Sequence, residues 1–441
     1  MPDRPNIVLV HSHDLGRRLG CYGVDVATPN VDAIADDGLR FDQFTCTAPQ
    51  CSPSRGSLHT GRYPHNNGLM GLTHRGWSLD DVPTLAATLS DAGYDTHTFG
   101  VQHIAEDDAD AGYDYSHRGG TALDAAECFE AELPEMAADG PFFASVGFVE
   151  PHLPFRVDHV EDAAYDRYHP ENVDAPPYLP DEYGVKRDVA EMHALISETV
   201  DPAVGHVRDA LDDAGLAEET LFVFTTDHGP PLPRAKGMCY TAGVGVAFIA
   251  HWPGVVESGV DDHLLSNVDV MPTFLDVAGV DKPPEMDGRT FAPLLTGEGT
   301  YDPREQVFVE MTWHDRYNPI RGIRTEEYTY LRNFSMLPRV FIPRDMIDQR
   351  AARPVRGEWY DRDRPAEEFY DRREDPHELE NLAAEAMVSR SAPADWDVPD
   401  PPTDLGPDRY AALHEFRERL REWMRATDDP LLDGPVGIPG R

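Results

Sequence analysis

The chain has 441 residues, with 80 acidic and 38 basic side chains and a formal net charge of −42. This acid excess argues against a nucleic-acid partner, which requires a basic surface, and against docking on an anionic membrane. Only three of the basic residues are lysines, and 40% of all residues are hydrophobic. We therefore expect a folded, halophilic protein, since salt screens the self-repulsion; a mesophilic protein of moderate acidity is the alternative, and the scarcity of lysine counts against it.

Short apolar runs alternate with helical patterns along the chain, which is typical of a doubly wound α/β domain. Buried strands are predicted at residues 6–10, 94–100, 142–149 and 220–226. Amphipathic helices are predicted at residues 30–38, 82–93 and 268–279. A further helix is expected to begin near Cys51, because Ser52 suits an N-cap and Pro53 suits the first helical turn.

Histidines and aspartates follow the predicted strands. His13 and Asp14 follow the first strand, and His103 and His152 follow the second and third. The fourth strand runs directly into Asp227 and His228. Ligands of parallel α/β sheets bind outside the carboxyl ends of the strands, so these side chains are expected at one rim, opposite the helix that carries Cys51. A lone histidine after a strand is more often a loop residue, but four coincidences of this kind are far less common.

The five cysteines are odd in number and show no CxxC spacing, which argues against a disulfide framework or a structural zinc site. No apolar stretch approaches the length of a membrane span. Only five residues precede the first apolar run, which is too few for a secretion signal. A soluble cytoplasmic protein is expected, with no membrane partner.

The segment CSPSRGSLHTGR, residues 51–62, resembles the signature of the sulfatase family. The stretches FTTDHGPPLPRAKG, HWPG and FYDRREDPHELENLA are similar to the heparan N-sulfatase branch of that family. The resemblance implies an alkaline-phosphatase-like α/β core with a large, mostly parallel sheet between helices. It also implies a smaller C-terminal α+β domain with an antiparallel sheet, and we place the two domains at residues 1–300 and 301–441.

The resemblance implies that Cys51 is oxidised to formylglycine (3-oxoalanine) by a formylglycine-generating enzyme. In the family, one hydroxyl of the hydrated aldehyde attacks sulfur and the other later expels sulfate. The alternative is a buried free cysteine, the usual state of this residue type. Arg55 would orient the nucleophile, while His103, His152 and Lys236 would hold the sulfate oxygens.

The resemblance also implies one divalent metal ion, with ligands His13, Asp14, Cys51, Asp227 and His228. Calcium is the metal that the resemblance favours. This chain departs from the family at His13, where many sulfatases have an aspartate. An imidazole there shifts the preference from calcium or magnesium toward manganese or zinc. Alternatively, His13 turns away and leaves Asp14 to bind alone.

Two further segments bear on the substrate. Val101 stands where many relatives have a lysine, and Gln102 is a candidate neutral substitute. The segment HDRYNPIRGIR resembles the substrate region of the heparan N-sulfatase branch, which suggests that His314 and Arg321 bind substrate. By default, such polar residues at the start of a second domain are surface groups.

The sequence therefore predicts a metal-dependent sulfatase that hydrolyses sulfate esters or sulfamates of a sulfated sugar, or another small sulfate ester. The alternative within enzymes is a phosphonate or phosphate diester hydrolase of the alkaline phosphatase superfamily. From another class, the chain is a non-catalytic sugar-binding relative in which Cys51 stays unmodified.

Overall fold

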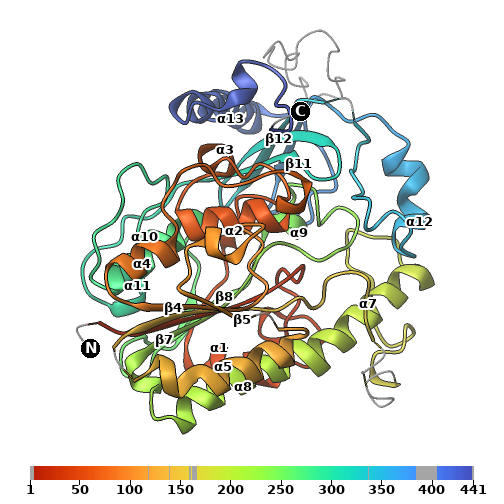
Figure 1. Ribbon diagram of the computed structural model, residues 1–441. Coiled ribbons are helices and arrows are strands. Elements are labelled where there is room, and N and C mark those ends of the chain that lie inside the picture. Colours follow the sequence, from red (N-terminus) through yellow and green to blue (C-terminus); the bar gives the residue numbers. More distant parts are fainter. Residues whose placement is uncertain are drawn as a thin grey trace.

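The computed structural model describes residues 4–117, 119–138, 140–157, 160, 166–335, 337–383 and 405–439. A large eight-stranded sheet runs through the centre, in the order β5-β4-β6-β1-β7-β8-β2-β9 (Figure 1). Its neighbouring strands are parallel except where β8 pairs with β7 and β2. The strands of this sheet are β1 (Asn6–Ser12), β2 (Leu39–Phe41), β4 (Asp95–Gly100), β5 (Tyr115–His117), β6 (Phe142–Gly147), β7 (Thr220–Thr226), β8 (Phe248–His251) and β9 (Gly259–Asp261).

Helices cover both faces of the large sheet (Figure 1). One face carries α1 (Pro29–Asp37), α5 (Ala122–Met136), α7 (Tyr183–Leu195) and α8 (Asp201–Asp213). The other face carries α2 (Cys51–Thr60), α4 (Leu85–Asp91), α10 (Val270–Val277) and α11 (Ala292–Thr296). The shorter helices are α3 (Pro64–Asn67), α9 (Thr241–Val244) and α12 (Ala352–Val355).

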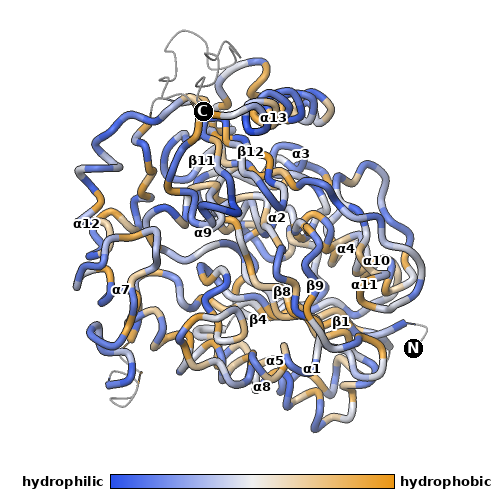
Figure 2. Tube along the Cα trace, turned by 180° about the vertical axis from the view of Figure 1, so that it is seen from behind, coloured by the Kyte–Doolittle hydropathy of each residue, from blue (hydrophilic) through white to orange (hydrophobic). Residues whose placement is uncertain are grey.

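The alternation of side chains along β1 explains the two layers. Val8 and Val10 pack into the core beneath α1, α5, α7 and α8, whereas Ile7 and Leu9 pack into the core beneath α2, α4 and α10. A strand that is apolar on both faces must be covered on both faces, as in other parallel sheets. Figure 2 shows apolar residues gathered in the strands of the large sheet, while the outer helix α13 (Pro407–Ala426) is largely hydrophilic.

A four-stranded antiparallel sheet follows, in the order β11-β12-β13-β14. Its strands are β11 (Val307–Trp313), β12 (Tyr317–Arg324), β13 (Tyr328–Asn333) and β14 (Glu367–Asp371). Val309 and Ile320 join the core of the large sheet, whereas Ile323 and Tyr330 pack beneath α13 with Leu413. A small parallel pair, β3 (Phe44–Thr45) and β10 (Leu265–Ser266), completes the strands among the described residues.

The predicted fold class and all four predicted strands are confirmed, with changed ends. β1 extends to Ser12, while the third predicted strand ends at Gly147 instead of residue 149. A Cβ at position 147 would lie 1.9 Å from the carbonyl oxygen of Val101, so the close approach of the next loop requires glycine there. The predicted boundary between residues 300 and 301 lies between the two sheets and stays a prediction.

The predicted helices differ from the observed ones at their ends, and the helix predicted at 30–38 is α1, Pro29–Asp37. The helix predicted at 82–93 begins at Leu85, because the side chain of Thr84 caps it by accepting a hydrogen bond from the backbone N–H of Ala87. The helix predicted at 268–279 is a 3-10 turn, Asn267–Asp269, followed by α10. Within the described residues, no helix has the length and apolarity that a bilayer crossing requires. The five cysteines are free.

Candidate active site

The carboxyl ends of β1 and β7 bring the expected acids and histidines together at one edge of the large sheet. β1 runs parallel to β6 and β7, and β4 runs parallel to β6, so these four strands end on the same side. His13, Asp14, Asp227 and His228 each place one possible ligand atom within 4.8 Å of the others. All four side chains are buried. We call these four residues the rim cluster.

The rim cluster has the donor set of a cation site. His13 Nδ1 lies 2.8 Å from Asp14 Oδ1 and 3.3 Å from Asp227 Oδ2, so the His13 ring turns into the cluster. His228 Nε2 lies 2.8 Å from the same Asp14 oxygen but makes no hydrogen bond of acceptable geometry. A buried polar atom without a hydrogen bond is costly, and a bound ion would satisfy it. Two carboxylates and two imidazoles fit a divalent cation.

The carboxylates and histidines of the rim cluster shift one another's titration. Burial lowers the pKa of His13, but Asp227 and Asp14 outweigh it and raise that pKa to about 9. Against the same effect of burial, the two carboxylates raise the pKa of His228 to about 10. Burial raises the pKa of Asp14, but Lys236 and the neighbouring histidines hold it well below its usual range. A cation must therefore displace protons from the imidazoles in order to bind them at neutral pH.

Cys51, the first residue of α2, faces the rim cluster. Its sulfur lies within 4.8 Å of ring nitrogens of His13 and His103. Burial raises the pKa of the Cys51 thiol, but the neighbouring imidazoles of His103, His13 and His228 outweigh it and hold that pKa well below its usual range. The free N–H groups of a helix amino terminus also favour an anion. The surroundings of Cys51 therefore stabilise negative charge.

Two side chains fix the start of α2 against the end of β7. The Ser54 hydroxyl donates to the carbonyl of Asp227 at 2.5 Å, and Asn267 Nδ2 donates to the Ser54 carbonyl at 2.8 Å. Arg55 Nε donates to Asp227 Oδ2 at 3.0 Å. The helix that carries Cys51 and the strand that carries Asp227 are thereby held as one unit.

Arg55 keeps a donor free within the site. Its Nη1 donates to His11 Nδ1 at 2.5 Å and lies 3.4 Å from the Val101 carbonyl, while its buried Nη2 has no hydrogen-bond partner among the described residues. Burial and Arg55 hold the pKa of His11 well below its usual range, so its neutral ring accepts from Arg55. The sequence analysis did not select His11, although it directly follows the strand predicted at residues 6–10; in the structure β1 extends past it to Ser12. The free guanidinium nitrogen is suited to an anionic substrate.

Lys236 carries a positive charge to the same rim. Its Nζ donates to Asp14 Oδ2 at 2.7 Å, to Asp345 Oδ2 at 2.8 Å and to His152 Nε2 at 3.3 Å. Burial lowers the pKa of Lys236, but Asp14 and Asp345 raise it above its usual range. Burial and Lys236 lower the pKa of His152 to about 4, so this ring is neutral at pH 7. Asp345 was also missed, since no sequence pattern links its loop to Lys236.

The loop after β4 corrects one expectation. His103 Nδ1 lies 3.1 Å from His13 Nε2, which places His103 at the site. Gln102 is not a free substitute for a lysine. Its Nε2 donates to the Ala105 carbonyl at 2.7 Å, and its Oε1 accepts from the N–H of Ile104 at 2.6 Å. The Gln102 amide braces its own loop, so the positive charge missing at Val101 is not replaced from this loop.

The two candidate substrate residues of the second sheet differ. His314 borders a cavity beside Trp77 and Trp313, so it remains a candidate. Arg321 has no exposed surface and pairs with Asp429, its Nη2 donating to Asp429 Oδ1 at 3.1 Å. The substrate contact of Arg321 stays a prediction, which the burial of Arg321 and its pairing with Asp429 disfavour.

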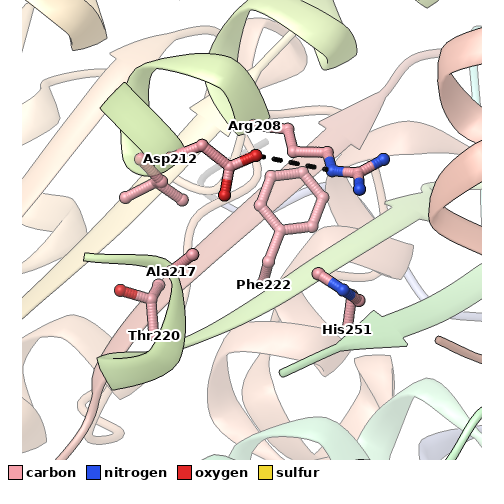
Figure 3. Close-up of a pocket in the computed structure, with 7 residues that line it drawn as sticks. Arg208, Asp212, Ala217, Thr220, Phe222 and His251 are labelled. Carbon is pink, nitrogen blue, oxygen red and sulfur yellow. Dashed lines mark ion pairs between the residues drawn. The ribbon is translucent and has the colours of Figure 1, made fainter. Parts of the chain in front are cut away.

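A small cavity lies at the opposite end of β7 from the rim cluster. Figure 3 shows a pocket beside Phe222, lined also by Arg208, Asp212 and His251. Arg208 Nε lies 4.0 Å from Asp212 Oδ2, the ion pair drawn as a dashed line in Figure 3. The cavity volume of 10 Å³ holds about one water molecule. This cavity is therefore too small to hold a substrate.

Comparison with known proteins identifies the family. The fold and the rim define a protein of the alkaline-phosphatase-like class. The family model Sulfatase matches residues 5–280, and the model N-sulphoglucosamine sulphohydrolase, C-terminal, matches residues 235–342. The chain belongs to the sulfatase family.

Curated relatives match nearly the whole chain. An ulvan-active sulfatase of Formosa agariphila is 28% identical, over 99% of this chain and 83% of its own. Human N-sulphoglucosamine sulphohydrolase is 27% identical, over 98% of this chain and 92% of its own.

Solved structures share the fold. One, described as a complex with its substrate D-glucosamine-2-N,6-O-disulfate, has a TM-score of 0.72 at 19% identity, over 98% of this chain and 100% of its own. The phosphonate monoester hydrolase of Agrobacterium radiobacter has a TM-score of 0.73 at 20% identity, over 96% of each chain.

Proposed function

We propose that this protein is a metal-dependent sulfatase that hydrolyses sulfate esters or sulfamates of a sulfated sugar through a formylglycine formed from Cys51. The observation that carries the proposal is the position of Cys51 at the start of α2, against the rim cluster. Membership of the sulfatase family supports the reaction type. The sulfated-sugar enzymes among the relatives support the substrate class.

Three side chains around Cys51 would each contact a bound sulfate group. Arg55 offers its free Nη2 to an anionic oxygen. Lys236 adds positive charge, but its three N–H groups face Asp14, Asp345 and His152, so a sulfate oxygen must share one of these hydrogens. His103, beside Cys51, is placed to donate to or accept from the reacting group.

The rim cluster and the modified Cys51 would hold one divalent cation. When bound, the cation supplies positive charge that activates the nucleophile and offsets charge on the sulfate. The resemblance favours calcium, as expected for carboxylate ligands. The inward orientation of the His13 ring supports manganese or zinc, which accept imidazole more readily.

Three further properties belong to this proposal. A formylglycine-generating enzyme modifies Cys51, since the segment around it matches the family signature. The protein works at high salt, which the charge of −42 with three lysines supports. It resides in the cytoplasm, which five free cysteines support, because thiols persist in reducing compartments.

Side-by-side turnover tests the reaction type. The purified protein, in high-salt buffer, is given an aryl sulfate, an N-sulfated glucosamine and an aryl phosphodiester. The proposal predicts a higher kcat/KM for one of the two sulfated compounds than for the phosphodiester. A preference for the phosphodiester would instead establish the alternative hydrolase, and binding of sugar without any turnover would establish a non-catalytic relative.

A further inference from the structure

A second hollow, lined in part by the candidate substrate residue His314, lies beside the candidate active site. Its volume is 400 Å³, within the usual range for small-molecule sites. It is formed by the 3-10 turn η2 (Thr73–Arg75), the end of β11 and the C-terminal segment. We call it the tail pocket. Its lining includes Arg75, Trp77, Trp313, His314, Ile438 and Pro439.

Two series of contacts join the tail pocket to the candidate active site. The backbone N–H of Thr73 donates to Ser52 Oγ at 3.3 Å, which holds η2 against the first turn of α2. On the other side, Asp345 accepts from Lys236. Asp315 of the pocket lining accepts from the backbone N–H of Arg344 at 3.1 Å, and Arg344 directly precedes Asp345 in the chain. The pocket therefore adjoins the rim from two directions.

The charge of the tail pocket is unusual for this acidic chain. Arg75 is exposed and forms no ion pair with any residue that the structure describes. The carboxylate in the lining, Asp315, is already bound by His314 Nδ1 at 3.1 Å and by the backbone N–H of Arg344 at 3.1 Å. The Nε of Arg316 lies 3.4 Å from its other oxygen. A free guanidinium beside a neutralised carboxylate favours an anionic ligand.

The remaining walls are aromatic and apolar. The rings of Trp77 and Trp313 lie 6.5 Å apart, tilted by 42°. Trp313 Nε1 donates to the carbonyl of Val436 at 2.8 Å, and the N–H of Val436 approaches the Tyr317 hydroxyl at 3.2 Å. These bonds anchor the C-terminal segment, so that Ile438 forms the outer wall. Aromatic rings with a polar edge suit a ligand that has both apolar faces and polar groups.

We propose that the tail pocket is a subsite for a second sulfate group of a multiply sulfated sugar. Arg75 binds that sulfate, the two tryptophans contact the sugar, and Ile438 and Pro439 close the outer wall. This inference rests on the proposed function, because the first sulfate group must lie at Cys51. It makes multiply sulfated sugars better ligands than singly sulfated ones.

Calorimetric titration tests the subsite without requiring turnover. D-Glucosamine-2-N,6-O-disulfate and the singly sulfated D-glucosamine-2-N-sulfate are titrated into the Cys51→Ala protein in high-salt buffer. We expect the disulfate to bind at least about tenfold more tightly, as for a charge-assisted bidentate contact. Arg75→Gln in the same background should abolish that difference. Arg425→Gln removes an equal charge from the exposed end of α13 and should preserve it.

The C-terminal wall provides a second, independent readout. The double variant Ile438→Ala/Pro439→Ala should weaken disulfate binding severalfold; its melting temperature is measured as well, because Ile438 is half-buried against the core. Equal affinity for the two sugars, or an advantage that survives Arg75→Gln, would overturn the subsite. The sulfate turnover described above is measured separately on the unsubstituted protein, so its failure would reject the proposed function and not this binding result.

Discussion

Two buried arginines show how the rim of the large sheet differs from the C-terminal sheet. Arg55 pairs with Asp227 and keeps one buried nitrogen without a partner. Arg321 pairs with Asp429 through two nitrogens, and its third nitrogen donates to the Met311 carbonyl at 3.0 Å. A saturated buried ion pair holds structure together, whereas an unsaturated one retains the capacity to bind. Burial and charge alone therefore do not identify a site.

The largest effect is expected from Cys51→Ala, which removes the proposed nucleophile and little volume. Turnover of an aryl sulfate should fall by at least about a thousandfold, as for loss of a covalent catalyst. The melting temperature should stay near that of the unsubstituted protein, since only one sulfur atom leaves the core. Activity that survives this substitution would remove Cys51 from the mechanism.

Asp227→Asn tests whether the unsaturated rim is a cation site. One formal charge leaves the rim cluster, so bound metal and activity should fall together, activity by about a hundredfold or more. Elemental analysis of the purified protein measures the metal. The control is Asp212→Asn, at the other end of β7, where the carboxylate belongs to the small cavity. Unchanged metal content in Asp227→Asn would show that this carboxylate is not a ligand.

Asp429→Asn tests whether the Arg321–Asp429 ion pair stabilises the fold. It removes the nearer partner of the buried Arg321, whose Nε then faces Glu310 Oε2 at 3.8 Å, and should lower the free energy of unfolding by about 3–5 kcal/mol. The double variant Arg321→Met/Asp429→Leu removes both charges and should recover part of that loss. Asp302→Asn is the matched control, because its partner Arg289 and its own side chain are exposed. Urea unfolding measures all of them, and a loss no larger than that of Asp302→Asn would contradict the structural role.

The pH dependence of metal binding sharpens the assignment of His13. Because the pKa of His13 is about 9 and that of His228 about 10, metal affinity should rise from pH 7 toward pH 9, about tenfold per unit for each displaced proton. His13→Asp removes one of these protons, so its affinity should rise less steeply. It should also shift the metal preference toward calcium or magnesium. An identical slope and metal preference would make His13 a bystander beside Asp14.

The smallest effect on stability is expected from His65→Gln. The His65 ring pairs with Glu310, which lies beside Arg321. Burial lowers the pKa of His65, but Glu310 outweighs it and raises that pKa above the ordinary value. A raised histidine pKa stabilises the fold at pH values below the unfolded pKa of about 6.5 and ceases to do so as the pH rises through the folded pKa. The stability difference between the wild type and His65→Gln should therefore shrink from pH 6 upward. Urea unfolding at several pH values measures it, and a constant difference would contradict the ionised pair.

Much of the rim could be predicted because its signals are local. The strand pattern places His13 and Asp227 at strand ends, and the 51–62 segment places Cys51 at a helix start. The partners of these residues could not be predicted in the same way. The contact of His11 with Arg55 joins residues of β1 and α2 that no local pattern links, and Asp345 comes from a loop far along the chain. The pairing of Arg321 with Asp429 could not be predicted either, because a sequence segment does not reveal whether a charge is already paired in the core.

The account depends most directly on the chemical state of Cys51. The protein is produced together with a formylglycine-generating enzyme, and its activity on the preferred sulfated compound is measured. The mass of the peptide that contains residue 51 is then determined by mass spectrometry. We predict that this peptide has lost its sulfur, carries an aldehyde, and is converted in proportion to the activity of each preparation. A fully active preparation in which Cys51 retains its thiol would contradict the central claim.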